Sequence, residues 1–493
     1  MPANHRTAPS IPQKGFFGHP KGLFTLFFTE FWERFSYYGM RAILLYYLYD
    51  TVANGGLGFD RATATAIVSI YGALVYMSGV LGGWLADRLF GTKKMVFYGG
   101  VIIMLGHIAL SIPGSTSAFF VSMILIILGT GLLKPNVSSV VGDLYTADDT
   151  RRDSGFSIFV MGINLGAFVA PLIVGTLGQK YNYHLGFAVA AVGMFIGLIV
   201  FLMTHKKYLG TAGEMPPNPL PANKRKNVIV SLVVGGLVIL AASALLLAYE
   251  IVTITFFINA VSILGVLLPI IYFIAMYRSK KTTSDEKSRL IAYIPLFVAA
   301  VMFWSIQEQG ATILALYAAE RTQLSLGSFT LQASWFQSLN PLFIIALAPI
   351  FAWLWLKLGS KQPGTPIKYG IGIIFAGASF LIMVIPAMMG GTQVSPLWLV
   401  FSFFLCVIGE LLISPVGLSI TTKLAPKAFS AQMMSMWFLT NACAQALNAQ
   451  LAGVFDKVSE TTYFGVLGGT AVILGLAMFA LTPMIKRAMR GIQ

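Results

Sequence analysis

The sequence predicts an all-α protein that crosses a membrane many times. Of its 493 residues, 57% are hydrophobic and only 10% are charged, whereas soluble globular proteins carry about 25% charged residues. Uncharged runs of about 20 residues, long enough to cross a bilayer as a helix, recur from one end of the chain to the other. The alternating pattern at ten-residue spacing that is typical of an outer-membrane barrel is missing. A large soluble core is excluded because the uncharged runs recur from end to end.

The apolar runs predict fourteen transmembrane helices. They are expected at residues 22–49, 62–86, 95–112, 117–142, 153–177, 184–204, 228–249, 253–277, 291–318, 331–358, 368–388, 396–422, 430–454 and 463–484.

The net charge of +15 reflects membrane orientation rather than nucleic-acid binding. With the N-terminus inside, the loops on the inner side hold most of the basic residues: Arg88, Lys93, Lys94, Arg151, Arg152, Lys206, Lys207, Lys224, Arg225, Lys226, Arg278, Lys280, Lys281, Lys287, Arg289, Lys357, Lys361, Lys423 and Lys427. The outer loops hold only Arg61, Lys180, Arg321 and Lys457. This asymmetry follows the positive-inside rule. It predicts a multi-pass protein of the plasma membrane with both termini in the cytoplasm.

Spans seven and eight differ from the others and suggest the domain organisation. They contain no ionisable side chain other than tyrosine and follow a proline-rich connector that ends in Lys224-Arg225-Lys226. A helix pair with nothing polar to shelter is expected at the periphery. We therefore predict six, two and six helices, divided into a cytoplasmic tail (1–21), an N-terminal bundle (22–204), a linker with an inserted hairpin (205–290), and a C-terminal bundle with a short tail (291–493).

The first span carries four ionisable side chains, which is unusual for a transmembrane helix. At 100° per residue, Glu33, Glu30, Arg41 and Arg34 fall at about −60°, 0°, +20° and +40° around the axis, and Tyr37 lies among them at about −20°. One charge at mid-bilayer costs roughly 3 kcal/mol, so four facing lipid would cost on the order of 10 kcal/mol. This face must turn toward partners or water, and it marks a functional site.

Three further ionisable residues are expected at membrane depth: Lys134, Glu308 and Glu410. The cations Arg34, Arg41 and Lys134 lie in the N-terminal half, whereas Glu308 and Glu410 lie in the C-terminal half. If the halves face each other, a zwitterion longer than one amino acid would fit between them, its carboxylate toward the N-terminal half. The alternative is that these charges pair only to hold helices together. That is a common role for one buried pair, but it does not account for seven charges whose three cations all lie in the N-terminal half.

A carboxylate is the expected proton carrier. Burial makes a carboxylate charge costly, and protonation removes that charge. No histidine accompanies the cluster, and no pair or triplet of His and Cys has metal-ligand spacing, so we expect no cofactor and no metal, with protons as the coupling ion. Aromatic side chains with polar tips could line pockets for varied ligand side chains, although packing is the ordinary role of each taken singly: Tyr37, Tyr38, Tyr76, Trp304 and Trp437.

Other polar or small residues in the apolar runs have more ordinary interpretations. His107 is expected to be a packing residue with satisfied ring nitrogens, and Cys406 and Cys443 to be small packing residues. Asn164 could bind a ligand or join two helices by a hydrogen bond. Glycines and prolines are expected to interrupt helices or allow close packing: Gly129, Gly131, Pro135, Gly162, Gly166, Pro415 and Gly417.

Three stretches resemble known families. Gly82–Arg88, with Lys93 and Lys94, is similar to the loop signature of the major facilitator superfamily, in which Asp87 and Arg88 would brace the inner gate. Glu30–Gly39 resembles the ExxERFxYYG signature of the proton-coupled oligopeptide transporter family within that superfamily. Phe156–Gly166 resembles its FYxxINxG signature, departing at Val160 where many members have tyrosine. The resemblance covers essentially the whole chain, and it implies a major facilitator fold.

The resemblance implies uptake of di- and tripeptides with protons. We expect the protein to function as a monomer, without a nucleic-acid partner. Glu30, Glu33 and Arg34 would couple protons together with Lys134. Arg34, Arg41 and Lys134 would hold the peptide carboxylate; Asn164, Asn340 and Glu410 would receive its amino end; and the five aromatic residues would line side-chain pockets. Glu308 would pair with Arg41 at the outer gate and respond to protonation, and Lys134 and Glu410 would also take part in gating. The histidine that animal members have in the second span is missing between Arg61 and Arg88.

Two other functions stay open at this point. A facilitator-fold transporter of another anion, such as nitrate, would share the cations but would need no site for an amino group. A receptor or intramembrane enzyme would show no flux, or would need a nucleophile with a base in reach, and no such constellation is visible. We therefore expect a transporter, not an enzyme.

Overall fold

The computed structural model describes residues 12–146, 149–249, 251–389 and 393–492. The helices in chain order are α1 (Gly22–Tyr49), α2 (Arg61–Leu85), α3 (Thr92–Leu110), α4 (Thr116–Asp143), α5 (Arg152–Lys180), α6 (Tyr183–Tyr208), α7 (Ala222–Ala248), α8 (Ile254–Arg278), α9 (Ser284–Glu308), α10 (Ile313–Glu320), α11 (Leu339–Leu358), α12 (Thr365–Met388), α13 (Leu397–Leu424), α14 (Ser430–Phe455) and α15 (Glu460–Ala488). Short segments η1 to η6 cover Val52–Asn54, Ala86–Phe90, Gln309–Ala311, Ala333–Ser338, Gly359–Lys361 and Lys427–Phe429. Two strands, β1 (Ser325–Leu326) and β2 (Phe329–Thr330), form a small antiparallel hairpin.

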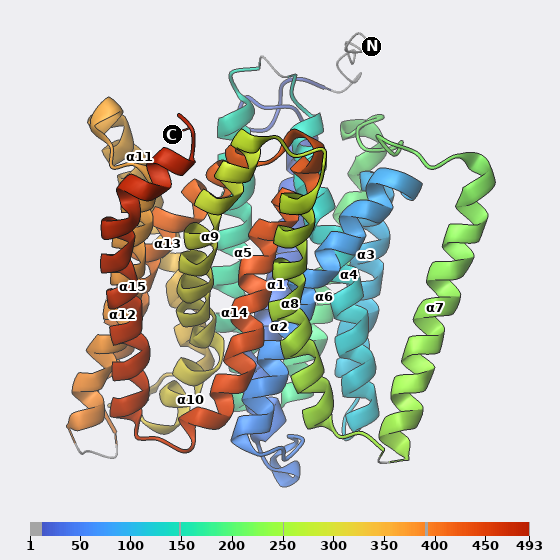
Figure 1. Cartoon of the computed structure of the whole chain (residues 1–493). Helices are drawn as coiled ribbons and strands as arrows, with labels where there is room; N and C mark the ends of the chain where they lie inside the picture. Colours follow the sequence, from blue (N-terminus) through green and yellow to red (C-terminus); the bar gives the residue numbers. More distant parts are fainter. Residues whose placement is uncertain (1–11, 147–148, 250, 390–392, 493) are drawn as a thin grey trace. The chain divides into compact units, whose positions relative to one another are not determined.

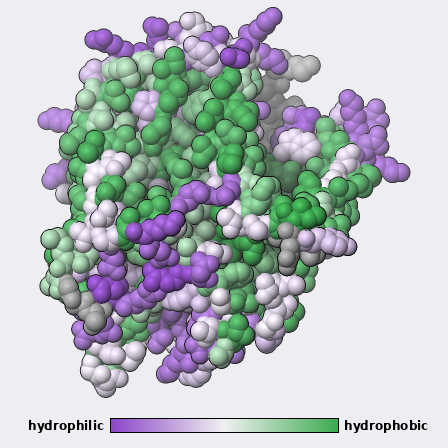
Figure 2. Space-filling view, turned by 60° about the horizontal axis from the view of Figure 1, so that its bottom comes forward, coloured by the Kyte–Doolittle hydropathy of each residue, from purple (hydrophilic) through white to green (hydrophobic). Residues whose placement is uncertain are grey.

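The predicted fold is confirmed: this is a polytopic helical membrane protein. Twelve helices in the described part of the chain are long and apolar enough to cross a membrane, with α9 and α10 counted as one. Helices α1 and α14 have the length but not the composition, because α1 carries charges and α14 carries amides. With them the chain has the fourteen predicted spans. Figure 2 shows broad hydrophobic surfaces beside hydrophilic regions, as expected for a protein that contacts lipid.

The chain divides into two compact units. Unit 1 comprises Met1–Tyr37, Ser78–Gly166 and Phe187–Ala260, and unit 2 comprises Tyr38–Met77, Ala167–Gly186 and Val261–Gln493. Helix α1 therefore contributes Glu30, Glu33 and Arg34 to unit 1 and Arg41 to unit 2. The division into bundles made from the sequence stays a prediction.

Close helix contacts in unit 1 depend on glycine. A Cβ on Gly99 of α3 would lie 2.7 Å from the Gly129 carbonyl oxygen of α4. A Cβ on Gly82 of α2 would collide with the Gly131 carbonyl. The expected close packing at these glycines is thus present. In the same unit α7 stands apart from α3 and α4 (Figure 1), and no described side chain of α7 is buried.

The expected interruption at Pro135 is wrong, because α4 continues through it to Asp143. Asn136 beside the proline donates from Nδ2 to the carbonyls of Leu132 and Gly82, so a side-chain amide supplies hydrogen bonds where the proline weakens the helix. The chain also continues through Pro415 in α13.

An unpredicted break occurs instead within the span expected at 291–318. Helix α9 ends at Glu308, η3 forms one tight turn, and α10 begins at Ile313. In unit 2, α9 contacts α12, α13, α14 and α15, and Figure 1 shows these helices running alongside it. The break therefore lies inside a packed bundle, with Glu308 at its edge.

Candidate functional site

The first cluster of buried charges lies on α1 within unit 1. Glu30, Glu33 and Arg34 are 1%, 0% and 3% exposed. Arg34 Nε lies 2.7 Å from Glu30 Oε1 and 2.8 Å from Glu33 Oε2, so one guanidinium nitrogen serves two carboxylates. The face predicted from helical spacing is therefore formed, and its charges are turned into the protein.

The donors in this cluster do not match its acceptors. Among the described residues, Glu30 Oε2 and both carboxylate oxygens of Glu33 are buried without a hydrogen-bond donor, so Glu33 meets Arg34 only as an ion pair. Lys134 on α4 lies close enough for its charge to act on Glu33. An ionised carboxylate that lacks hydrogen bonds in a dry interior is costly, and adding a proton is one chemical way to remove that cost.

Two glycines of α5 bring that helix against this cluster. A Cβ on Gly162 would lie 2.8 Å from the ring of Phe27, and a Cβ on Gly166 would collide with the Phe31 carbonyl and reach Arg34 Cβ at 3.2 Å. Both glycines belong to the stretch Phe156–Gly166. Gly162 and Gly166 are four residues apart and so lie on one face of α5. This face packs closely on α1 beside Arg34.

The second cluster surrounds Glu308 in unit 2. Arg41 Nη2 and Glu308 Oε2 form an ion pair, with side chains 11% and 7% exposed. From α14, Asn441 Nδ2 donates to Glu308 Oε1 at 2.9 Å and Gln445 Nε2 donates to Oε2 at 2.7 Å. The pairing of Arg41 with Glu308 is thus present, and both oxygens of this carboxylate have donors.

Polar side chains beside Glu308 hold the break after α9. Asn448 Oδ1 accepts from Ser305 Oγ at 2.7 Å and from Gln309 Nε2 at 3.2 Å, and its Nδ2 donates to the Ser305 carbonyl. Tyr463 OH of α15 donates to Gln309 Oε1 at 2.8 Å. These contacts fix the turn that ends α9, and with it the position of Glu308.

Sequence reasoning missed the amides of α14. Asn441, Gln445 and Asn448 are spaced by four and three residues, so they share one face of a helix that lies in the membrane. An intramembrane stripe of three amides was a readable signal that this face meets a polar group.

The Glu410 carboxylate forms a third polar group in unit 2. Its Oε2 accepts from Asn340 Nδ2 of α11 at 2.8 Å and from Gln307 Nε2 of α9 at 2.9 Å. The family resemblance assigned Asn340 and Glu410 to one site, and the structure brings these two side chains into contact. Asn164, in unit 1, donates from Nδ2 to the Val160 carbonyl of its own helix. A gating role of Lys134 and Glu410 stays a prediction.

The aromatic candidates fall in both units. Trp304 and Trp437 of unit 2 meet edge to face with centroids 6.4 Å apart, and Trp437 packs on Gly417 of α13, where no larger side chain fits. In unit 1 the guanidinium of Arg34 lies 5.8 Å from the ring centroid of Tyr37. Tyr38 and Tyr76 are half-buried in unit 2. Their role in lining side-chain pockets stays a prediction.

The predicted gating loop is hydrogen-bonded to the linker after α6. Asp87 and Arg88 lie in η2, and their carbonyls accept from the backbone N–H groups of Asn218 and Leu220. Lys93 Nζ donates to the Gly210 carbonyl at 2.6 Å and to Glu214 at 3.1 Å. The loop and the linker thus form one hydrogen-bonded layer of unit 1.

Two expectations about isolated residues have clear outcomes. His107 is fully buried, but neither ring nitrogen has a hydrogen-bond partner among the described residues, so the expectation of a satisfied histidine is wrong. Cys406 and Cys443 are buried and free, as expected for packing residues.

Comparison with known proteins identifies the family. A family model described as PTR2, POT family, matches residues 93–470. The chain belongs to the POT family. This POT chain is 67% identical over 490 residues to the uncharacterized transporter YclF of Bacillus subtilis (strain 168), covering 99% of each chain. It is 50% identical over 492 residues to a di-/tripeptide transporter of Lactococcus lactis subsp. cremoris, covering 98% of this chain and 99% of the relative.

Solved structures agree with this assignment. The crystal structure of a peptide transporter POT in complex with sulfate superimposes with a TM-score of 0.95 at 63% identity, over 98% of each chain. The POT chain therefore has the major facilitator fold that the motifs implied.

Proposed function

We propose that this chain is a proton-coupled symporter that imports di- and tripeptides. Its POT relatives are described as di-/tripeptide transporters and its structural neighbours as peptide transporters. The nitrate alternative finds no support in these relatives. The observation that carries the proposal is that buried carboxylates pair with two arginines of α1, the helix that contains the POT signature. Glu30 and Glu33 pair with Arg34, and Glu308 pairs with Arg41.

Proton coupling follows from competition for these arginines. While Glu33 or Glu308 is ionised, its charge holds the neighbouring guanidinium. When Glu308 takes up a proton, Arg41 loses its carboxylate counter-ion and can attract the peptide carboxylate. When Glu33 takes up a proton, Arg34 faces the charge of Glu30 alone, so more of its charge acts on the peptide carboxylate, together with that of Lys134. Binding of the proton therefore raises the affinity for the peptide, and binding of the peptide raises the affinity for the proton. This reciprocal coupling is what symport requires.

The other site residues complete the proposal. Asn164, Asn340 and Glu410 would receive the peptide amino group, and Tyr37, Tyr38, Tyr76, Trp304 and Trp437 would contact its side chains. The protein would act as a monomer in the plasma membrane, with both termini in the cytoplasm, no bound cofactor and no enzymatic activity.

Uptake into liposomes tests the function. Purified protein is reconstituted, and an inside-negative, inside-alkaline gradient is imposed. We expect labelled di-alanine to accumulate above its external concentration, and a protonophore to abolish the accumulation. Unlabelled di- and tripeptides should compete, whereas free alanine and nitrate should not. Accumulation that survives the protonophore, or competition by nitrate equal to that by di-alanine, would refute the proposal.

A further inference from the structure

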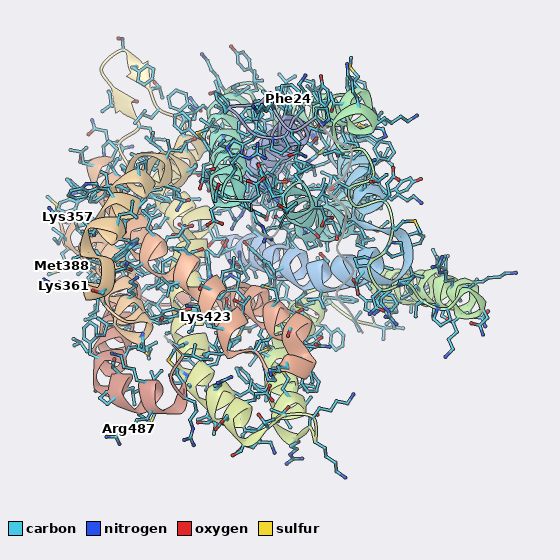
Figure 3. All side chains as sticks on the ribbon, turned by 90° about the horizontal axis from the view of Figure 1, so that it is seen from above. Phe24, Lys357, Lys361, Met388, Lys423 and Arg487 are labelled. Atoms are coloured by element: carbon cyan, nitrogen blue, oxygen red, sulfur yellow. The ribbon has the colours of Figure 1, made fainter. Side chains whose placement is uncertain are left out.

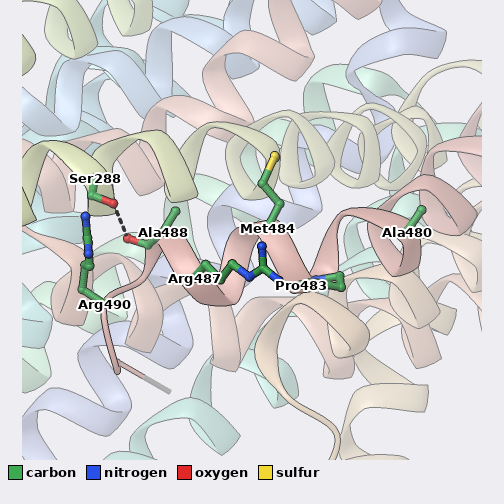
Figure 4. Close-up of a pocket in the computed structure, with 7 residues that line it drawn as sticks. All are labelled: Ser288, Ala480, Pro483, Met484, Arg487, Ala488 and Arg490. Atoms are coloured by element: carbon green, nitrogen blue, oxygen red, sulfur yellow. Dashed lines mark hydrogen bonds between the residues drawn. The ribbon is translucent and has the colours of Figure 1, made fainter.

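A groove of about 510 Å³ lies in unit 2 where the first turns of α9 meet the last turns of α15. Figure 4 shows its lining, which comprises Ser288, Ala480, Pro483, Met484, Arg487, Ala488 and Arg490. Ser288 Oγ donates to the Ala488 carbonyl at 2.9 Å and so ties the two helix ends together. The proposed transport mechanism does not use this groove.

The lining changes character along α15. Pro483 and Met484 come three and four residues after Ala480, and Arg487 comes four and three residues after them, so all four lie along one face of the helix. The first three are apolar, and Met484 is 53% exposed. Helix α15 is one of the candidate membrane spans, and Arg487 lies in its last turn. The groove therefore passes from hydrocarbon depth to head-group depth within about two helical turns.

The head-group end of the groove is basic. Arg487 and Arg490 are both exposed at its rim, and Lys486 is exposed on the same last turn of α15. Asp285 lies 3.7 Å from Arg490 in an ion pair whose side chains are 57% and 68% exposed, so solvent screens this pair, and Arg487 has no ion-pair partner among the described residues. Figure 3 views this end of the helices and labels Arg487 with Lys357, Lys361 and Lys423 of the same unit.

We propose that this groove binds a phospholipid with an anionic head group. Arg487 and Arg490 hold the phosphate and the additional negative charge of the head group, since guanidinium groups match phosphate oxygens in geometry and charge. An acyl chain lies along Ala480, Pro483 and Met484. By the positive-inside rule, the lipid comes from the cytoplasmic leaflet. A free phosphate ion shares only the chemistry of the head group and gains nothing from the apolar wall.

Native mass spectrometry of the full-length protein tests this proposal. The delipidated protein is titrated with phosphatidylglycerol or phosphatidylcholine of equal chain length. We expect wild type to retain phosphatidylglycerol preferentially. Arg487→Gln/Arg490→Gln should weaken that retention by on the order of tenfold, because each basic residue near an anionic surface contributes measurably to binding. The control Lys280→Gln/Lys281→Gln removes two exposed charges outside the groove and should bind like wild type.

A second variant tests the apolar part and separates a lipid from free phosphate. Ala480→Trp fills the hydrocarbon end and leaves both arginines in place. We expect it to lose phosphatidylglycerol, and we expect millimolar inorganic phosphate not to displace the lipid from wild type. Equal retention of the two lipids, equal loss in both double variants, unchanged binding by Ala480→Trp, or displacement by inorganic phosphate would each overturn the proposal.

Discussion

The carboxylates of α1 and the carboxylate at the end of α9 are both buried beside an arginine, but they are satisfied differently. Glu30 and Glu33 share one guanidinium nitrogen of Arg34, and three of their four oxygens lack a hydrogen-bond donor among the described residues. Glu308 meets Arg41 and also accepts hydrogen bonds from Asn441 and Gln445. One cluster is short of donors, whereas the other has a donor for each oxygen.

This difference separates two tasks that buried charges can perform. In the α1 cluster a change in protonation alters which carboxylate holds Arg34, because Glu30 and Glu33 share its guanidinium. At Glu308 the amides hold the carboxylate in one position whether or not Arg41 stays. We interpret the α1 cluster as suited to passing Arg34 from one carboxylate to the other. We interpret Glu308 as a fixed carboxylate whose protonation leaves Arg41 without its counter-ion.

The largest contrast is expected between Arg34→Ala and Arg41→Ala. Arg34→Ala removes the guanidinium that pairs with two buried carboxylates and should lower the free energy of unfolding by about 3–5 kcal/mol. Arg41→Ala leaves Glu308 with both amide donors and should cost about 1–3 kcal/mol. Thermal unfolding of the two purified variants at pH 7.5 measures the difference. A loss in Arg41→Ala equal to or greater than that in Arg34→Ala would contradict the comparison.

The amide donors provide the next test. Removing the Gln445 amide takes a charge-assisted hydrogen bond from Glu308, so Gln445→Leu should cost about 1.5–3 kcal/mol and reduce gradient-driven uptake several-fold. Asn448→Ala should disturb the turn after α9 and reduce uptake as well. The matched control is Gln450→Leu, whose amide donates to Ser262 of α8 instead of Glu308. Uptake lowered equally in the control would show that the amides of α14 serve only packing.

The packing of α5 on α1 gives a third test. Gly166→Ala forces a methyl group against the Phe31 carbonyl and should destabilise the protein by about 1–3 kcal/mol, with loss of uptake. Gly83→Ala on α2 is the matched control, since a Cβ there meets no atom within 4 Å. The ratio of folded to aggregated protein in size-exclusion profiles reports the result. If the two variants behave alike, the close approach at Gly166 is not required.

The smallest effect concerns the segment before α1, outside both clusters. Burial and the charge of Arg151 lower the pKa of His19, whose Nδ1 lies 3.0 Å from Tyr145 OH. Hydrogen bonds from Arg151 lower the pKa of Asp149 to about 2, so that carboxylate stays ionised. Neutral His19 therefore stabilises the packing of the segment before α1 against Tyr145. This stabilisation is complete above the ordinary pKa of 6.5 and is lost as the pH falls below that value.

Hydrogen exchange of residues 12–21 checks this prediction. After correction for the intrinsic pH dependence of exchange, protection should be lower at pH 5.5 than at pH 7.5 in wild type and unchanged in His19→Gln. The uptake rate of His19→Gln should equal that of wild type. Protection that falls equally in both proteins would place the pH response at another group.

Much of this architecture is predictable from the sequence because its signals are local. The apolar runs locate α1 within one residue at each end, and helical spacing alone places Glu30, Glu33 and Arg34 on one face. Charges are conspicuous in apolar helices, so Glu308 and Glu410 were also identified.

The rest depends on partners that are distant in the chain. The break after Glu308 is held by Asn448 and Tyr463, more than 130 residues later, and nothing near Gln309 predicts them. Pro135 was expected to interrupt α4, but the neighbouring Asn136 supplies hydrogen bonds across two helices. Which oxygen receives which donor is a tertiary property, so the contrast between the two clusters emerged only from the structure.

The most direct test of the coupling mechanism is the behaviour of Glu308→Gln in liposomes. Glutamine keeps the size of the side chain but carries no charge and cannot release a proton, so Arg41 is no longer held by a carboxylate. We predict that this variant exchanges labelled di-alanine across the membrane at a rate within a few-fold of wild type, yet fails to accumulate it under an inside-negative, inside-alkaline gradient. A variant that still concentrates the peptide would show that Glu308 does not couple proton and peptide transport.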